Sequence, residues 1–115
     1  LVGSQVLIET GNIIKSCVRD IDIVVRYGGD EFIVILVETD PEGSRVVSER
    51  IRSLMEESPF RVRENLELRV TCCVGIATFP DDTENRTELI HLADKAMYRG
   101  KETTRNVVYS VSELE

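Results

Sequence analysis

Four consecutive residues, Gly28, Gly29, Asp30 and Glu31, separate two apolar runs at residues 23–27 and 32–37. Glycine allows backbone angles that other residues resist and lets a ligand approach the main chain closely. Adjacent carboxylates supply the oxygen ligands that Mg²⁺ takes together with substrate phosphates. The same residue types are common in tight hairpins with solvated acids at the tip, so composition alone leaves both interpretations open.

The surrounding sequence predicts the elements that position this turn. Apolar spacing predicts a helix over residues 4–19, a second that is marked by residues 47–55 and ends near Ser58, and a third around 86–97, with Asn85 and Glu88 placed as a capping box. Pro41 and Gly43 predict a turn over residues 38–43. Apolar runs predict strands near 23–27, 32–37, 60–62, 66–79 and 106–110, with 32–37 covered on both faces. We therefore predict an α+β fold, an antiparallel-containing sheet with flanking helices.

Composition limits the class of protein. The 115 residues predict a single domain over 1–115. The net charge of −7 argues against a nucleic-acid partner, and the absence of a long apolar run argues against membrane contact. Cys17, Cys72 and Cys73 lack metal-type spacing, which favours buried thiols in a reducing compartment, so we expect a cytoplasmic protein.

Three stretches carry a resemblance to a known family. The segment RYGGDEF, from Arg26 to Phe32, matches the signature of the GGDEF diguanylate cyclases, which condense two GTP molecules into cyclic di-GMP and pyrophosphate. CCVGIATFP resembles the family's S-x-G-x-A strand, and LADKAMYRGKETTRN resembles its closing motif. The resemblance runs from Gly3 to Asn106 and implies the nucleotidyl-cyclase-like fold.

The resemblance implies roles for individual residues. Gly28 and Gly29 would line the nucleotide pocket, and Asp30 would bind Mg²⁺ or Mn²⁺. Glu31 would serve the metal site or activate the attacking 3′-hydroxyl. Lys101 and Arg105 match the phosphate-contacting pair. Their i, i+4 spacing also predicts one helical face, where cations at a helix C-terminus would be favourable without a ligand.

A second site is implied by Arg19 and Asp22. They form R-x-x-D, and five residues separate Asp22 from Gly28, as in the family's product-binding inhibitory site. Arg50 matches the arginine that joins this site from a neighbouring domain. Arginine pairs with phosphate or stacks on guanine, and a carboxylate accepts from guanine N–H groups. The alternative is an Arg–Asp pair that closes a helix.

The chain also departs from the family. The family's first strand, with its metal-binding Asp, has no counterpart here, so we expect a partial domain from a longer protein, inactive alone. Without this first strand, which lies in the middle of the family's sheet, we expect the neighbouring strands to have unpaired backbone edges. Ser4 stands where the family has an Asp that recognises guanine. Cys73, Gly100 and Thr104 replace the usual serine, alanine and glycine.

The leading hypothesis is a product-inhibited diguanylate cyclase that works as a homodimer, because each domain holds one GTP. An upstream sensory or regulatory region is expected. The alternative is a catalytically silent receptor that binds cyclic di-GMP through Arg19, Asp22 and Arg50. A third possibility is a scaffold that dimerises an attached domain and binds no nucleotide.

Overall fold

The computed structural model describes residues 2–114, without the side chains of residues 2 and 62. Its elements follow the order α1 (Val2–Cys17), β1 (Ile23–Arg26), β2 (Phe32–Ile35), α2 (Pro41–Glu57), β3 (Phe60–Arg63), β4 (Leu66–Leu68), β5 (Cys73–Ile76), α3 (Arg86–Lys101), β6 (Val107–Ser110) and a 3₁₀ turn (Val111–Glu113). The predicted α+β class is confirmed. Among the described residues, no helix is long and apolar enough to cross a membrane.

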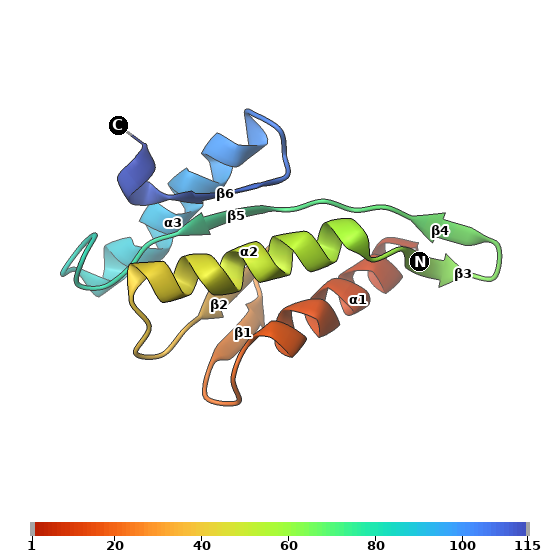
Figure 1. The fold of residues 1–115 in the computed structure, drawn as a ribbon, viewed down its shortest axis with the longest axis horizontal. Coiled ribbons are helices and arrows are strands. Elements are labelled where there is room, and N and C mark those ends of the chain that lie inside the picture. The colour runs from red at the N-terminus through yellow and green to blue at the C-terminus, as the bar shows by residue number, and fades with distance from the viewer. Residues whose placement is uncertain (1, 115) are drawn as a thin grey trace.

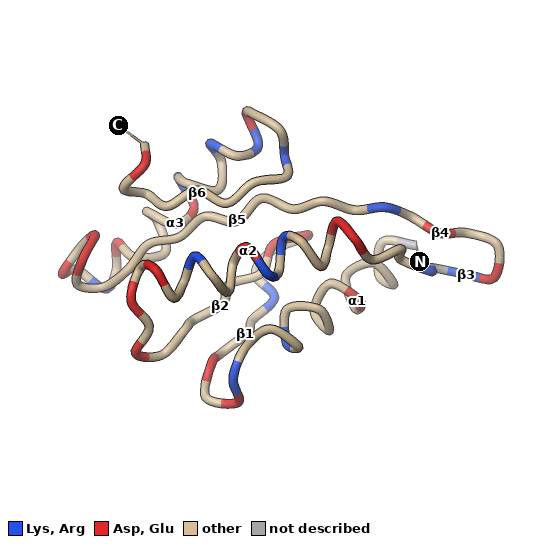
Figure 2. The backbone as a smooth tube through the Cα atoms, in the orientation of Figure 1, with Lys and Arg blue, Asp and Glu red and all other residues tan. Residues whose placement is uncertain are grey.

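The elements form an elongated molecule with α2 across its middle (Figure 1). Helix α1 lies beside α2, α3 packs against β5 and β6, and the β3–β4 hairpin projects at one end. Acidic and basic residues alternate along α2 rather than gathering in blocks (Figure 2).

The described strands divide into three two-stranded sheets. β1 and β2 pair antiparallel, as do β3 and β4, whereas β5 and β6 pair parallel. The prediction of one strand over residues 66–79 is wrong, because β4 pairs with β3 while β5 pairs with β6. Because β4 and β5 pair with different strands, the hydrogen-bond ladder is interrupted between residues 68 and 73.

The helix boundaries follow from local hydrogen bonds. Helix α1 ends at Cys17 rather than at residue 19, because the carboxylate of Asp22 accepts from the Arg19 backbone N–H at 2.8 Å. Asp40 caps α2 by accepting from Gly43 N at 2.7 Å, so the helix begins at Pro41 and the predicted turn over residues 38–43 is wrong from Pro41 onward. Asn85 caps α3 as predicted, accepting from Thr87 N at 3.0 Å. The predicted capping box with Glu88 is wrong, because Asn85 N donates to Thr83 Oγ1 instead.

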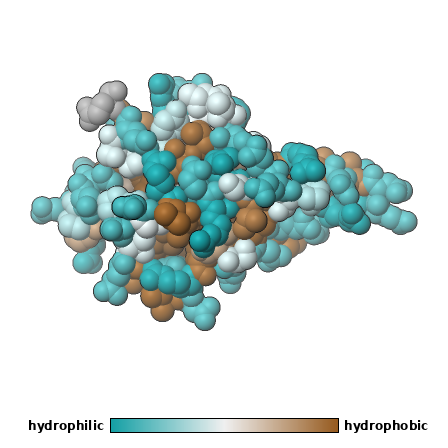
Figure 3. All heavy atoms as spheres, in the orientation of Figure 1, coloured by the Kyte–Doolittle hydropathy of each residue, from teal (hydrophilic) through white to brown (hydrophobic). Residues whose placement is uncertain are grey.

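The largest core cluster lies where α1, α2 and β3 meet. Its most buried members are Ile14, Cys17, Ile51, Met55 and Phe60. One face of the β1–β2 hairpin packs on this cluster, and the other stays open, with Ile23 at 48% and Ile35 at 46% exposure. The prediction that residues 32–37 are covered on both faces is therefore wrong at Ile35. Figure 3 shows hydrophobic surface at the lower edge of one face, where the segment leading into β1 lies in Figure 1.

Gly75 sets the distance between β5 and α3. A Cβ there would lie 2.0 Å from the carbonyl oxygen of Ala93 and 2.4 Å from the backbone nitrogen of Met97. Both are helix backbone atoms, so neither can rotate away. The glycine is therefore required for this helix to pack directly on the strand.

We predict that Gly75→Ala lowers the free energy of unfolding by about 3 kcal/mol, because the helix must move off the strand. The matched control is Gly11→Ala. Its Cβ would meet Phe32 at an ordinary 3.7 Å, and it removes a glycine from a helix interior. It should raise the same free energy by about 0.5–1 kcal/mol. Urea denaturation of both variants measures these changes, and equal effects would contradict the close-approach explanation.

Candidate functional site

The turn between β1 and β2 is closed by its own backbone. Tyr27 N donates to Glu31 O at 2.7 Å, and the Arg26 guanidinium donates to Gly29 O at 2.9 Å. Gly28 has φ +84°, in the left-handed region that favours glycine, whereas a Cβ on Gly29 would meet nothing within 4 Å. Gly28 thus shapes the turn and Gly29 leaves open space, with Asp30 exposed beside it.

The C-terminal end of α3 lies against this turn. Lys101 Nζ is 3.8 Å from Glu31 Oε2, and both side chains are partly shielded, at 30% and 26% exposure. Lys101 also lies over the Tyr98 ring, 5.2 Å from its centroid. The structure therefore brings together two predicted site residues that are 70 positions apart in the sequence.

Arg105 reaches this region by a different route from the one predicted. Helix α3 ends at Lys101, and Arg105 lies in the following turn with φ +60°, so the prediction that both cations share a helical face is wrong. The polar run after Gly100 does not continue the helix, and Arg105 N instead donates to Gly100 O at 3.1 Å. Both cations still lie near Cys73. Burial raises the pKa of this thiol, and the charges of Lys101 and Arg105 act in the opposite direction.

Ser4 lines a second, smaller pocket. The pocket has a volume of about 260 Å³ and is also lined by Leu7, Ile8, Arg26 and Phe32. It lies between α1 and the end of the β1–β2 hairpin next to the turn, where Arg26 ends β1 and Phe32 begins β2, so the hairpin that carries the acidic turn also sets its position. Its lining is mostly apolar, with one hydroxyl and one guanidinium available for hydrogen bonds.

Arg19 and Asp22 form a bidentate pair in the turn after α1. Arg19 Nε and Nη2 donate to the two carboxylate oxygens at 3.1 and 3.0 Å. Arg19 Nη2 also donates to Val37 O and, at 3.0 Å, to Thr39 Oγ1, while Val37 N donates to Asp22 Oδ1 at 3.0 Å. The Asp22 side chain is only 1% exposed, whereas that of Arg19 is 53% exposed. These hydrogen bonds from Arg19 and from the backbone of Val37 lower the pKa of Asp22 to about 2.

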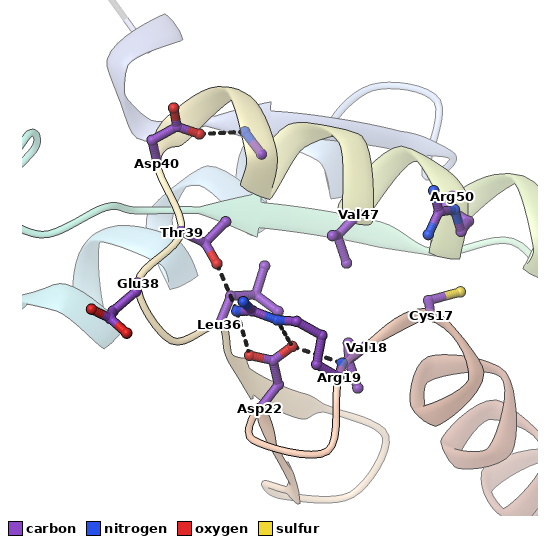
Figure 4. Close-up of a pocket in the computed structure, with 11 residues that line it drawn as sticks. Cys17, Val18, Arg19, Asp22, Leu36, Glu38, Thr39, Asp40, Val47 and Arg50 are labelled. Carbon is purple, nitrogen blue, oxygen red and sulfur yellow. Dashed lines mark hydrogen bonds and ion pairs between the residues drawn. The ribbon is translucent and has the colours of Figure 1, made fainter.

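The same pair lines the larger pocket, of about 570 Å³ (Figure 4). Arg50 lines it from α2, so the structure gathers all three predicted inhibitory-site residues around one open space. Two further acids border it: Asp40, occupied as the cap of α2, and Glu38, which points away from Arg19 in Figure 4. Residue type and spacing contain no signal for these two acids, because only the fold brings the segment after β2 to the turn after α1.

The described residues include no group of three or more His, Cys, Asp or Glu side chains able to hold a metal ion. Asp30 and Glu31 could contribute carboxylate oxygens to a divalent cation. Because two carboxylates supply only part of the ligands that such a cation takes, the remaining ligands would be phosphate oxygens, water or other groups. Burial raises the pKa of the Cys72 thiol to about 11, which keeps it protonated and unsuited to metal binding.

An α+β fold that places an acidic glycine turn against the cationic end of a helix is suited to holding the phosphates of a nucleotide. Comparison with known proteins identifies the family. The profile described as "Diguanylate cyclase, GGDEF domain" matches residues 1–107, and the chain belongs to this family. The resemblance inferred from RYGGDEF and the two downstream motifs is thereby confirmed.

Curated relatives agree with this assignment. Diguanylate cyclase A of Treponema denticola is 40% identical over 106 residues, covering 92% of this chain and 28% of that protein. The response regulator PleD of Caulobacter vibrioides is 36% identical over 108 residues, covering 93% of this chain and 24% of that protein. The chain thus spans less than a third of the length of these relatives.

Solved structures share the fold. The GGDEF domain of YfiN (TpbB) from Pseudomonas aeruginosa superposes with a TM-score of 0.89 at 30% identity, covering 95% of this chain and 68% of that one. The active GGEEF domain of a diguanylate cyclase from Vibrio cholerae gives a TM-score of 0.81 at 26% identity, covering 94% of this chain and 67% of that one.

The depressed pKa of Asp22 makes a prediction about acid stability. The unfolded chain, with the ordinary pKa of 3.8, takes up the proton more readily than the folded chain, with a pKa of about 2. The stability from the ionised carboxylate should thus be complete above the unfolded pKa and disappear as the pH falls through the folded one. Asp22→Asn should destabilise the chain at neutral pH, and its difference from the wild type should shrink in acid.

Urea denaturation of both proteins from about pH 7 down to about pH 2 measures this difference. Asp20→Asn, an exposed acid in the same turn, is the matched control and should have little effect at any pH. A penalty for Asp22→Asn that stays constant over this range would show that its ionisation does not stabilise the turn.

Proposed function

We propose that this chain is the larger part of a diguanylate cyclase domain that condenses two GTP molecules into cyclic di-GMP and pyrophosphate. The 3′-hydroxyl oxygen of each GTP forms a bond to the α-phosphorus of the other. At each α-phosphorus the bond to the oxygen that bridges to the β-phosphate breaks, so two pyrophosphates leave, and each hydroxyl proton goes to a base. The observation that carries the proposal is the intact RYGGDEF turn, in a family member, with Glu31 next to Lys101.

The geometry supports a role for each residue of this site. Gly28 and Gly29 leave room for the nucleotide beside the main chain. Asp30 and Glu31 would hold Mg²⁺ or Mn²⁺ together with phosphate oxygens, and the cation would neutralise charge on the reacting phosphates. Glu31 is also a candidate for activating the 3′-hydroxyl. Lys101, at the end of α3, would bind the outer phosphates.

Two more residues complete the proposed substrate site. Arg105 lies in the turn after α3 and would share the outer phosphates with Lys101. Ser4 lines the smaller pocket, where its hydroxyl would hydrogen-bond the guanine base. A hydroxyl brings no negative charge, so selectivity for guanine over adenine would be weaker than with an aspartate there.

The activity would belong to a longer, homodimeric protein. Each domain would hold one GTP, so two domains must face each other for the reaction to occur. The shares of 28% of a curated relative and 68% of a solved domain support a longer parent. The proposal includes an upstream sensory or regulatory region and a cytoplasmic catalytic part, as expected from the sequence. The 115-residue chain alone would be inactive, because its two carboxylates supply only part of a metal site.

Product inhibition would act through the larger pocket. Arg19 and Arg50 would bind the phosphates of cyclic di-GMP, and Asp22 would accept from guanine. The bidentate pair with Asp22 leaves Arg19 half-exposed, so it can still meet a ligand at its outer edge. A product bound here, joined by Arg50 of a neighbouring domain, would hold domains in an unproductive pairing.

The second candidate is a receptor that binds cyclic di-GMP without making it. The replacement of the guanine-recognising Asp by Ser4 favours it, together with the absence of a complete metal cluster among the described residues. The two candidates share the larger pocket and differ in whether Asp30 and Glu31 support turnover. A scaffold would use neither site.

We predict that Asp30→Asn, in the full-length protein, lowers turnover of GTP at least about 100-fold, because a metal-bound carboxylate supports the transition-state charge. Binding of cyclic di-GMP should be unchanged, since Asp30 does not line the larger pocket. Product formation by chromatography and calorimetric titration measure the two effects. Asp20→Asn is the control for loss of one exposed charge. Loss of both properties together would contradict two separate sites.

We also predict that this chain binds cyclic di-GMP and that Arg50→Ala weakens binding at least about tenfold, the cost of a lost charge-assisted contact. Arg50 is exposed on α2, so its removal spares the turn that Arg19 holds together. Arg61→Ala removes an exposed arginine from β3, outside the pocket, and is the matched control.

In the full-length protein, Arg50→Ala should relieve inhibition by product without lowering the initial rate. Arg19→Ala should also relieve inhibition, but it removes the hydrogen bonds that hold the turn after α1 and so should lower the initial rate as well. Calorimetric titration of this chain with cyclic di-GMP, and with GTP and Mg²⁺, measures binding at the two sites. Inhibition assays on the full-length protein measure the effect of product on the rate. An unchanged inhibition constant in Arg50→Ala would mean that the pocket is only a structural junction. Tight Mg²⁺-dependent binding of GTP by the isolated chain would overturn the proposal that it lacks a working half-site.

A further inference from the structure

Arg52 connects helix α2 to the segment that carries Arg105. Its side chain is only 19% exposed, and Nη1 donates to the side-chain oxygen of Asn106 at 2.9 Å. Asn106 directly follows Arg105 and lies 54 positions from Arg52 in the sequence. Arg52 lies outside the three sequence motifs that carry the family resemblance.

The contact with Asn106 differs in kind from the other hydrogen bonds of Arg52. Those go to Glu49 at 3.3 Å, Glu56 at 3.1 Å and Ser53 at 3.2 Å, all on the same helix. Ion pairs of this kind on a helix surface contribute only a few tenths of a kcal/mol. Among the described residues, the bond to Asn106 is the one hydrogen bond that joins the Arg52 side chain to a part of the fold outside α2.

The backbone of Arg105 needs such support. Its φ of +60° is in the left-handed region, which is unfavourable for a residue with a Cβ unless the surroundings hold it. Arg105 N donates to Gly100 O and Arg105 O accepts from Thr71 Oγ1, both at 3.1 Å. These bonds fix the residue on the α3 and β5 sides, and the bond from Arg52 to Asn106 fixes it on the α2 side.

We propose that Arg52 is a positioning residue, which holds Asn106 so that the turn presents the Arg105 guanidinium to the outer phosphates of GTP. This rests on the proposed function, which assigns Arg105 to phosphate binding. Arg50, two residues earlier on α2, lines the pocket proposed for product. One helix therefore contacts both the product pocket and the phosphate-binding turn.

The test compares three variants in the full-length protein. Arg52→Gln removes the charged fork while keeping most of the stem, and Asn106→Ala removes the acceptor. Glu56→Gln removes an ion-pair partner of Arg52 and leaves the Asn106 contact, so it is the matched control. Steady-state kinetics gives KM for GTP and kcat, and amide hydrogen exchange of the 115-residue chain gives local protection of the Arg105 N–H.

We expect Arg52→Gln and Asn106→Ala each to raise KM about tenfold with kcat changed less than about twofold, because a phosphate contact made before and during reaction is lost. Their combination should raise KM no further, since both break one contact. Exchange at Arg105 should speed up in both single variants relative to amides in α1. Glu56→Gln should leave KM and exchange unchanged. A general loss of stability would instead speed exchange throughout the chain.

Two results would overturn the inference: an unchanged KM in Arg52→Gln while Arg105→Ala raises it, or additive effects of Arg52→Gln and Asn106→Ala. Failure of the proposed function has a different signature, a wild-type parent that makes no cyclic di-GMP. In that case unchanged exchange at Arg105 in Arg52→Gln would also overturn the role of Arg52 in holding the turn.

Discussion

The carboxylate of Asp22, almost fully shielded from solvent, accepts hydrogen bonds from the chain on both sides of the β1–β2 hairpin. Arg19 N donates to it at the end of α1, and Val37 N donates to it where the chain leaves β2. A buried carboxylate without partners would cost several kcal/mol, so these donors and the Arg19 guanidinium are needed together. Because the hairpin is fixed at its base, its tip with Asp30 and Glu31 is held in place.

The same constraint shapes the proposed inhibitory site. Arg19 cannot serve as a free cation, because Asp22, Val37 and Thr39 already take its donors on one side. A ligand in the larger pocket would therefore use the outer edge of the Arg19 guanidinium and the exposed side chain of Arg50. The two interpretations of R-x-x-D, an internal pair and a ligand site, are compatible, since the internal pair orients the arginine that a ligand would meet.

Local sequence patterns predicted the features that depend on near neighbours. The glycine turn, the cap at Asn85 and the existence of three helices follow from residue type and spacing, whereas the cap at Asp40 was not predicted. The end of α1, the break between β4 and β5 and the turn at Arg105 depend on partners distant in sequence. Periodicity carries no information about Asp22 accepting from Arg19 N, or about which strand β5 pairs with. The family resemblance assigned Lys101 and Glu31 to one substrate site. Only the fold shows that the ammonium of Lys101 lies 3.8 Å from the carboxylate of Glu31.

Two departures from the family motif, Cys73 and Gly100, face each other in the fold. A Cβ on Gly100 would lie 2.9 Å from a methyl carbon of Val107, 3.2 Å from Cys73 Cβ and 3.3 Å from Cys73 Sγ. Both β5 and β6 therefore press on this point of α3, and a side chain at Gly100 would push the helix away from them. Gly75 lets the same helix pack directly on the strand, and the helix ends one residue later than Gly100, at Lys101. The packing of Cys73 and Gly75 of β5 against α3, with Gly100 at the contact, therefore determines where the Lys101 ammonium meets the acidic turn. A change in this interface would move a charge in the proposed active site.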